Sequence, residues 1–163
     1  MTATLYVVDV SAHTAPIHAG PRIEVAADSR TALNGITDGS LLKFPSSLLR
    51  EANYRLPVVM SRAIYEDTIQ WSRPPLRGAN GLYDEDTRNW DLLWMAKPAA
   101  ADARNFPGKR FGFQMQRMPN RNTSSEISRQ THYDRIALTV ETMAYDRSGK
   151  TCLAITPQYE SAD

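Results

Sequence analysis

"RNWDLLWMAK", which spans Arg88 to Lys97, is the stretch that decides the fold, because its apolar residues follow a helical repeat and cover most of the helix surface. At about 100° per residue, Trp90, Leu93 and Trp94 fall on one stripe. A helix that is apolar nearly all round belongs in a core. We therefore expect a central helix whose two indoles are both buried.

The residues on either side of this stretch predict where the helix begins and ends. Three acidic residues, 84–86, stand at its start and Lys97 stands near its end, as the helix dipole favours. Pro98 interrupts the pattern. A proline removes one backbone hydrogen bond inside a helix. The residues 99–105 that follow are therefore either a kinked continuation or a separate turn.

Farther from this stretch, the remaining sequence alternates between helical and extended patterns. Helices are predicted at 28–40, where Asp28 or Ser29 is the N-cap and Gly39 the end, and at 46–56 and 61–71. Strands are predicted at 4–10, 22–27, 109–118, 135–146 and 150–160. The last two strands flank the turn "RSG" and are expected to form a hairpin.

Helices in the middle of the chain and strands toward its ends are typical of the α+β class. We expect an antiparallel sheet of three to five strands with helices packed on one face. The 163 residues suit a single domain, 1–163, in which residues 1–28 are an N-terminal extension that contributes a strand. The breaker-rich "RPPLRGANG" at 73–81 is interpreted as a surface loop rather than a linker.

Composition excludes several classes of function. The net charge of +1 provides no global field for an anionic membrane or DNA, and no dense acidic surface for a DNA mimic. No apolar run is long enough to span a membrane, and the N-terminus lacks the basic start of a secretion signal. Cys152 is the only cysteine, so no intrachain disulfide can form and a buried thiol is expected. These features predict a cytoplasmic protein.

A basic and aromatic segment, Arg104 to Arg121, is the first candidate binding region. It contains no acidic residue, and Phe106, Phe111 and Phe113 are interleaved with its cations. The cations that we assign to a partner or to nucleic acid are Arg104, Lys109, Arg110, Arg117 and Arg121. Such a pattern is typical of single-stranded nucleic-acid platforms. It is equally that of a core strand whose phenylalanines point inward.

A second candidate site is centred on Asp91. A carboxylate within an apolar helix either reaches solvent at the helix start or meets a cation or backbone donors, and Arg62 and Arg88 are the partners we predict. Together with Glu66, these residues form the candidate site of an enzyme: Arg62, Glu66, Arg88 and Asp91. No catalytic motif accompanies them, and the spacing of the three histidines predicts no metal site. We predict no cofactor.

The runs "SRAIYEDTIQW" and "LYDEDTRNWDLLWMA" resemble a family of small bacterial proteins carried by plasmids and phages, classed as a domain of unknown function. The resemblance extends from about Ser29 to Glu160, although Pro98 interrupts what is an alanine-rich helix in the family. It implies an accessory protein of a mobile genetic element and no catalytic roles. Proteins of this kind, such as anti-restriction and anti-CRISPR inhibitors, act by binding host machinery.

These observations lead to three alternative functions. The first is a non-catalytic, counter-defence binding protein whose partner is a host or phage protein complex. The second is a nucleic-acid-binding module that uses residues 104–121. The third is a small enzyme with its site near Arg62, Glu66 and Asp91.

Overall fold

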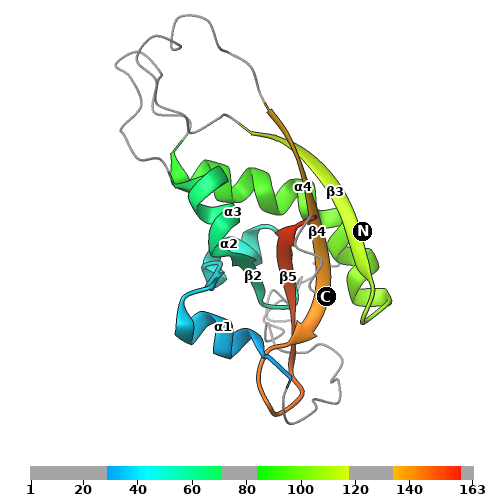
Figure 1. The fold of residues 1–163 in the computed structure, drawn as a ribbon. Helices are drawn as coiled ribbons and strands as arrows, with labels where there is room; N and C mark the ends of the chain where they lie inside the picture. The colour runs from blue at the N-terminus through cyan, green and yellow to red at the C-terminus, as the bar shows by residue number, and fades with distance from the viewer. Residues whose placement is uncertain (1–28, 71–83, 118–133, 159–163) are drawn as a thin grey trace, which may run out of the picture.

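The fold is built around one five-stranded sheet in the order β1-β2-β5-β4-β3 (Figure 1). The computed structural model describes residues 29–70, 84–117 and 134–158. Its strands are β1 (Leu41–Lys43), β2 (Val58–Ser61), β3 (Arg110–Arg117), β4 (Asp134–Ala144) and β5 (Thr151–Pro157). Its helices are α1 (Ala32–Asp38), α2 (Ser46–Glu51), α3 (Arg62–Ile64), the π-helical turn η2 (Tyr65–Ile69) and α4 (Glu85–Asn105).

This arrangement confirms the α+β prediction, and the sheet is mostly antiparallel. β1 pairs with β2, and β3, β4 and β5 pair in sequence, all antiparallel. The β4–β5 hairpin was predicted. The exception is β2, which runs parallel to β5 and joins the two antiparallel parts of the sheet. The strands predicted at 4–10 and 22–27 and the loop 73–81 lie outside the described residues.

The prediction that all helices pack on one face is incomplete, because α1 covers the opposite face from α4. Leu153 and Ile155 of β5 belong to the main core with α4, whereas Cys152 and Ala154 pack with Ala32 of α1. All five residues from Thr151 to Ile155 are buried. A strand buried on both faces needs a cover on each side, and here the second cover is α1.

The first turn of α1 begins at Thr31 rather than at the predicted Asp28 or Ser29. The Thr31 hydroxyl accepts from the Asn34 backbone N–H, and the Asn34 side chain accepts from the Thr31 backbone N–H, which completes a capping box. Gly39 ends the helix at φ 79°, as its sequence position predicted. Thr31 is itself buried, next to Ala32 of the smaller core formed by Ala32, Val59, Cys152 and Ala154.

The helix α4 runs without interruption through Pro98 for 21 residues. The proline is on the exposed side, where the Trp94 carbonyl that loses its partner can face water. Two hydrogen bonds from other elements hold the helix. The Tyr54 hydroxyl donates to the Leu93 carbonyl at 2.7 Å, and the Thr142 hydroxyl donates to the Ala103 carbonyl at 2.7 Å.

The prediction that both tryptophans are buried is wrong for Trp94, which is 59% exposed, while Leu92 and Leu93 are fully buried. The buried stripe of α4 is displaced by one residue from the stripe that contains the two indoles. Its apolar members are Leu92, Leu93, Ala96, Ala99, Ala100 and Ala103. The small alanine side chains let α4 approach β3 and β4 closely, and this leaves the bulkier Trp94 and Met95 at the surface.

This burial pattern predicts opposite outcomes for two neighbouring substitutions. Leu93→Ala should lower the free energy of unfolding by about 2–5 kcal/mol, because it empties a fully buried site. Trp94→Ala should lower it by no more than about 1.5 kcal/mol, the range of a surface aromatic contact. Urea unfolding followed by circular dichroism measures both. A larger loss for Trp94→Ala than for Leu93→Ala would contradict the observed orientation of α4.

Candidate functional site

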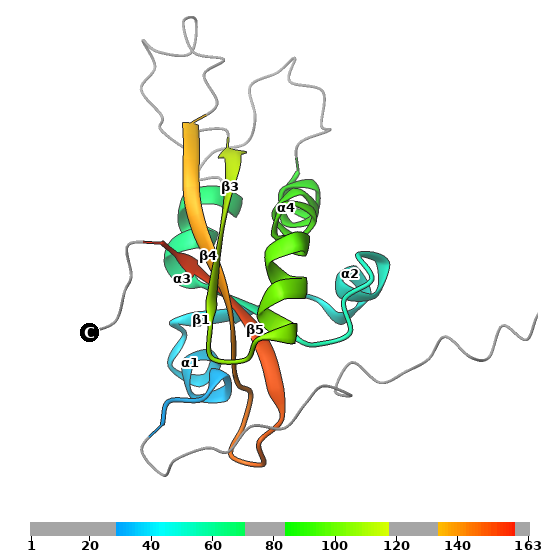
Figure 2. The ribbon, with the colours of Figure 1, turned by 90° about the vertical axis from the view of Figure 1, so that its right-hand side faces the viewer.

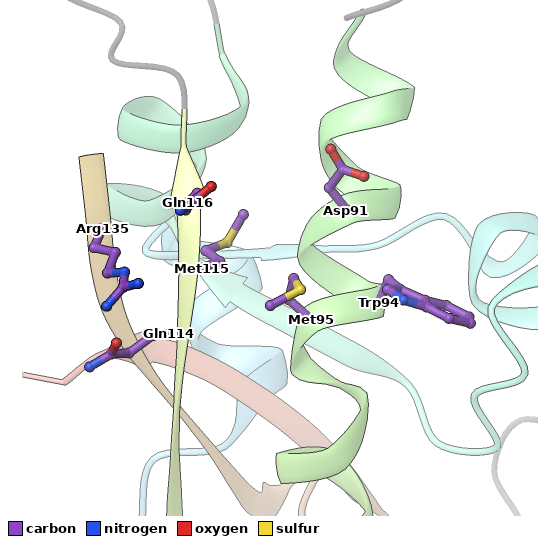
Figure 3. A pocket seen from close by; sticks show the side chains of 7 residues that line it. All are labelled: Asp91, Trp94, Met95, Gln114, Met115, Gln116 and Arg135. Atoms are coloured by element: carbon purple, nitrogen blue, oxygen red, sulfur yellow. The ribbon is translucent and has the colours of Figure 1, made fainter. Parts of the chain in front are cut away.

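A surface pocket of about 580 Å³ lies between the exposed flank of α4 and the outer edge of β3 (Figure 3). We call it the α4–β3 groove. Its lining residues are Asp91, Trp94, Met95, Gln114, Met115, Gln116 and Arg135. α4 and β3 lie beside each other over most of their length, as Figure 2 shows. The groove occupies one part of this seam, between residues 91–95 of α4 and 114–116 of β3.

The α4 wall of the groove combines apolar surface with one carboxylate. Trp94 is 59% and Met95 43% exposed. The Trp94 ring lies 6.3 Å from that of Trp90, centroid to centroid, and the Lys97 ammonium lies 5.2 Å from its centre. In Figure 3, Met95 points toward β3, while Trp94 points away from β3 and extends the apolar wall along α4.

The β3 wall consists of three consecutive residues that point alternately to the two faces of the sheet. Met115 is buried and packs into the main core, whereas Gln114 and Gln116 are exposed on the opposite face. Arg135 of β4 pairs in register with Gln116 and lies on the far side of β3 from α4 (Figure 3). The groove therefore extends around the free edge of the sheet.

Asp91 is the electrostatic centre of the α4 wall. Among the described residues it forms neither a hydrogen bond nor an ion pair. Partial burial raises the pKa of its carboxyl group above the usual value of 3.8, because desolvation disfavours the charged form. A carboxylate at this place is well suited to receive a cation supplied by a ligand.

The two arginines that the sequence suggested as partners of Asp91 are engaged elsewhere. The Arg88 side chain is buried, and its Nε donates to the Ile69 carbonyl at 2.7 Å, which ties α4 to η2. Arg62 donates to the Gly39 carbonyl, and its guanidinium lies 3.7 Å from the Glu66 carboxylate. The expected anchoring of Asp91 by an arginine is therefore wrong.

The alternative site of Arg62, Glu66, Arg88 and Asp91 is only partly brought together. The hydroxyl of Tyr65 donates to Glu85 at 2.8 Å, and this bond raises the Tyr65 pKa. Arg62 and Arg88 act on the same phenol in the opposite direction. Of these four residues, only Asp91 lines the α4–β3 groove.

The predicted basic segment is divided between several environments. Arg104 is exposed in the last turn of α4, Lys109 lies 5.7 Å above the ring of the exposed Phe106, and Arg110 pairs with Glu141 at 3.0 Å. Arg117 ends β3, and Arg121 lies outside the described residues. Phe111 and Phe113 pack against the main core and are only partly accessible.

A second pocket, of about 460 Å³, adjoins the first at Arg135. Residues of α3, η2, β4 and the end of β5 line it: Ala63, Ile64, Asp67, Thr68, Arg135, Ile136, Ala137, Leu138, Pro157 and Gln158. Because both pockets share Arg135, this residue lies where the two pockets meet.

Sequence reasoning identified Asp91 but missed the other residues of the groove. The signal for Trp94 and Met95 was present, since they lie outside the Leu–Ala stripe at 92, 93, 96, 99, 100 and 103. No sequence signal could show that β3 is an edge strand, because strand order depends on the whole topology. Gln114, Gln116 and Arg135 could not be placed for this reason.

The lining offers apolar contact, two amides, one acid and one base, which is a chemistry suited to recognition. In the described parts of the chain, no group of three or more histidine, cysteine, aspartate or glutamate side chains is placed to hold a metal. Within the same parts, no helix has the length and apolarity needed to cross a bilayer. Comparisons with family models, curated proteins and solved structures find no match.

The raised pKa of Asp91 predicts the sign of a pH effect. The folded state disfavours the ionised carboxyl group, so wild-type stability should fall as pH rises from about 3.8 through the folded pKa. Asp91→Asn removes this penalty. The variant should be slightly more stable than wild type at about pH 7 and should match it below about pH 3.8, where both forms are neutral.

Urea unfolding between about pH 3 and 7 measures this difference. Asp84→Asn is the control of opposite sign, because Asp84 is the N-cap of α4 and hydrogen bonds from Thr87 lower the pKa of its carboxyl group. It should destabilise the protein at neutral pH, opposite in sign to Asp91→Asn. A clear loss of stability on Asp91→Asn at neutral pH would show that the carboxylate has a favourable partner.

Proposed function

We propose that this chain is a non-catalytic binding protein that holds a partner protein in the α4–β3 groove. The observation that carries the proposal is the exposure of Trp94 and Met95 beside Asp91, which has no hydrogen bond or ion pair with any residue that the structure describes. Tryptophan and methionine are enriched at interfaces, and large aromatic residues contribute most of the affinity at many of them. A partner that covers this wall buries both side chains and can neutralise Asp91.

The groove is prepared for binding because its α4 wall is held rigidly. Leu92 and Leu93, the neighbours of Asp91 and Trp94 in the chain, are fully buried in the main core. The hydroxyls of Tyr54 and Thr142 fix the helix at two points along its length. A wall that is already ordered loses little conformational entropy on association, and this favours affinity without any new contact.

The resemblance to plasmid- and phage-borne proteins supports a particular setting for this binding. We place the protein in the cytoplasm as an accessory protein of a mobile element, with a host or phage protein complex as its partner. A counter-defence inhibitor of the anti-restriction or anti-CRISPR kind requires only that a functional surface of the partner be covered. A rigid groove with an apolar wall meets that requirement without catalytic residues.

Photo-crosslinking in the native cell tests this proposal. The photoreactive residue p-benzoylphenylalanine in place of Met95 should capture one partner protein, because Met95 lies within the groove. Leu33 is the matched control site, since it is an exposed apolar residue on α1, which covers the opposite face. The same substitution at Leu33 should capture none of that partner.

The captured protein is then identified, purified and titrated against the intact chain. Trp94→Ala should weaken binding by about tenfold or more, the loss expected when a large aromatic side chain that the partner covers is truncated. Leu33→Ala should change it by less than about twofold. Equal affinities for wild type and Trp94→Ala would refute the assignment of the groove as the binding surface.

A second candidate function, nucleic-acid binding, is favoured by the turn between α4 and β3. Phe106 is 53% exposed there, Lys109 lies over its ring, and Arg104 and Arg110 flank it. Fluorescence anisotropy with a labelled single strand of about 20 nucleotides tests it. Binding should weaken steeply between about 50 and 200 mM salt and should be lost on Phe106→Ala. A flat titration at low salt would exclude this function.

A further inference from the structure

The outer edge of β3 is open among the described residues. β3 ends the strand order, and β4 occupies its other side along all eight residues. An edge strand carries a row of backbone N–H and C=O groups on its free side. Edge strands are commonly shielded by a proline, a bulge or a charge. The central part of β3, from Phe111 to Gln116, has no proline or charged residue and keeps a continuous register with β4.

The composition of the groove indicates where an occupant must lie. Gln114, Met115 and Gln116 are consecutive, so their side chains point to opposite faces of the sheet, and yet all three line one pocket. A body resting on one face would touch either the glutamines or the methionine. A body beside β3, in the plane of the sheet, can contact all three together with Met95 and Asp91.

We propose that an extended segment of the partner adds to the free edge of β3 as a sixth strand. This inference rests on the proposed binding function and specifies its mode. Strand addition gives each backbone group on the β3 edge a partner, and side-chain pockets on the two faces then supply selectivity. The eight residues of β3 are long enough for a strand of typical length.

Charge complementarity specifies the chemistry of the added strand. Its side chains alternate, so one set lies toward α4 and meets Met95, Met115 and Asp91. This set must be apolar and include one lysine or arginine for the unpaired carboxylate. The other set lies beside Gln114 and Gln116, on the side of Arg135. Glutamine, asparagine or an acidic residue fits there.

A phage-displayed library of linear peptides about ten residues long, selected on the intact protein, is the probe for this mode. Enriched peptides should alternate apolar and polar residues, with lysine or arginine among the apolar set. The most enriched peptide is then synthesised and its affinity measured. Met95→Ala should weaken its binding, and Leu33→Ala, on the opposite face of the sheet, should leave it unchanged.

Backbone methylation of that peptide separates strand addition from other modes. In an added strand, every second backbone N–H faces β3. N-methylation of this set of amides (the first phase) should weaken binding about tenfold or more, because each lost hydrogen bond costs roughly 1 kcal/mol and several are lost together. Methylation in the other phase should change affinity little, since those amides face away from the sheet. Equal effects of the two phases would overturn the inference.

A charge exchange tests the role assigned to Asp91. Asp91→Lys should abolish binding of the basic peptide, and replacement of the peptide's basic residue by glutamate should restore it. The thermal melt of Asp91→Lys confirms that the variant is folded. Failure of the exchange to restore binding, or selection of no alternating peptide, would also overturn strand addition. Peptides that depend on Met95 but not on methylation phase would refute strand addition and still support the binding function.

Discussion

The packing of the Leu–Ala stripe of α4 against the sheet is the constraint on which the rest of the structure depends. Leu92 and Leu93 fill the centre of the core, and the alanines that follow them bring the helix close to β3 and β4. Packing of this stripe fixes the rotation of α4 about its own axis, and this determines which residues lie on its outer side. Asp91, Trp94 and Met95 therefore point outward because their neighbours point inward.

The same packing explains how a proline is accommodated in a long central helix. Pro98 lies on the exposed side, so its ring does not disturb the buried stripe, and the carbonyl it leaves unpaired belongs to the exposed Trp94. The hydrogen bonds from Tyr54 and Thr142 lie on either side of this point. They hold the parts of α4 before and after the proline against the rest of the fold.

The sequence was sufficient to predict the class, the helix as far as Lys97 and the last three strands, whose patterns are periodic. It left open whether the helix continues beyond Pro98, as α4 does. It was insufficient for β1 and β2, which are three and four residues long and show no alternation. The burial of Trp94 was predicted wrongly because two overlapping stripes of α4 are apolar, and only the sheet can choose between them. Asp91 was recognised as unusual, but its lack of a partner depends on where Arg62 and Arg88 are engaged.

The partly buried Asp91 carboxylate, which has no cation beside it among the described residues, is unfavourable for folding. The exposed Trp94 side chain contributes little to the stability of the folded state. Both occur one turn or less apart on a helix whose inner side packs leucine and alanine side chains against the sheet. Residues whose placement is unfavourable for folding tend to cluster at functional sites, because there the residues are selected for binding a ligand rather than for stabilising the fold. The free edge of β3 lines the same groove as Asp91, and the backbone groups on its free side are likewise unpaired among the described residues. An added strand with a basic side chain would satisfy the carboxylate, the apolar wall and the open backbone at once, which no change within the described core could do.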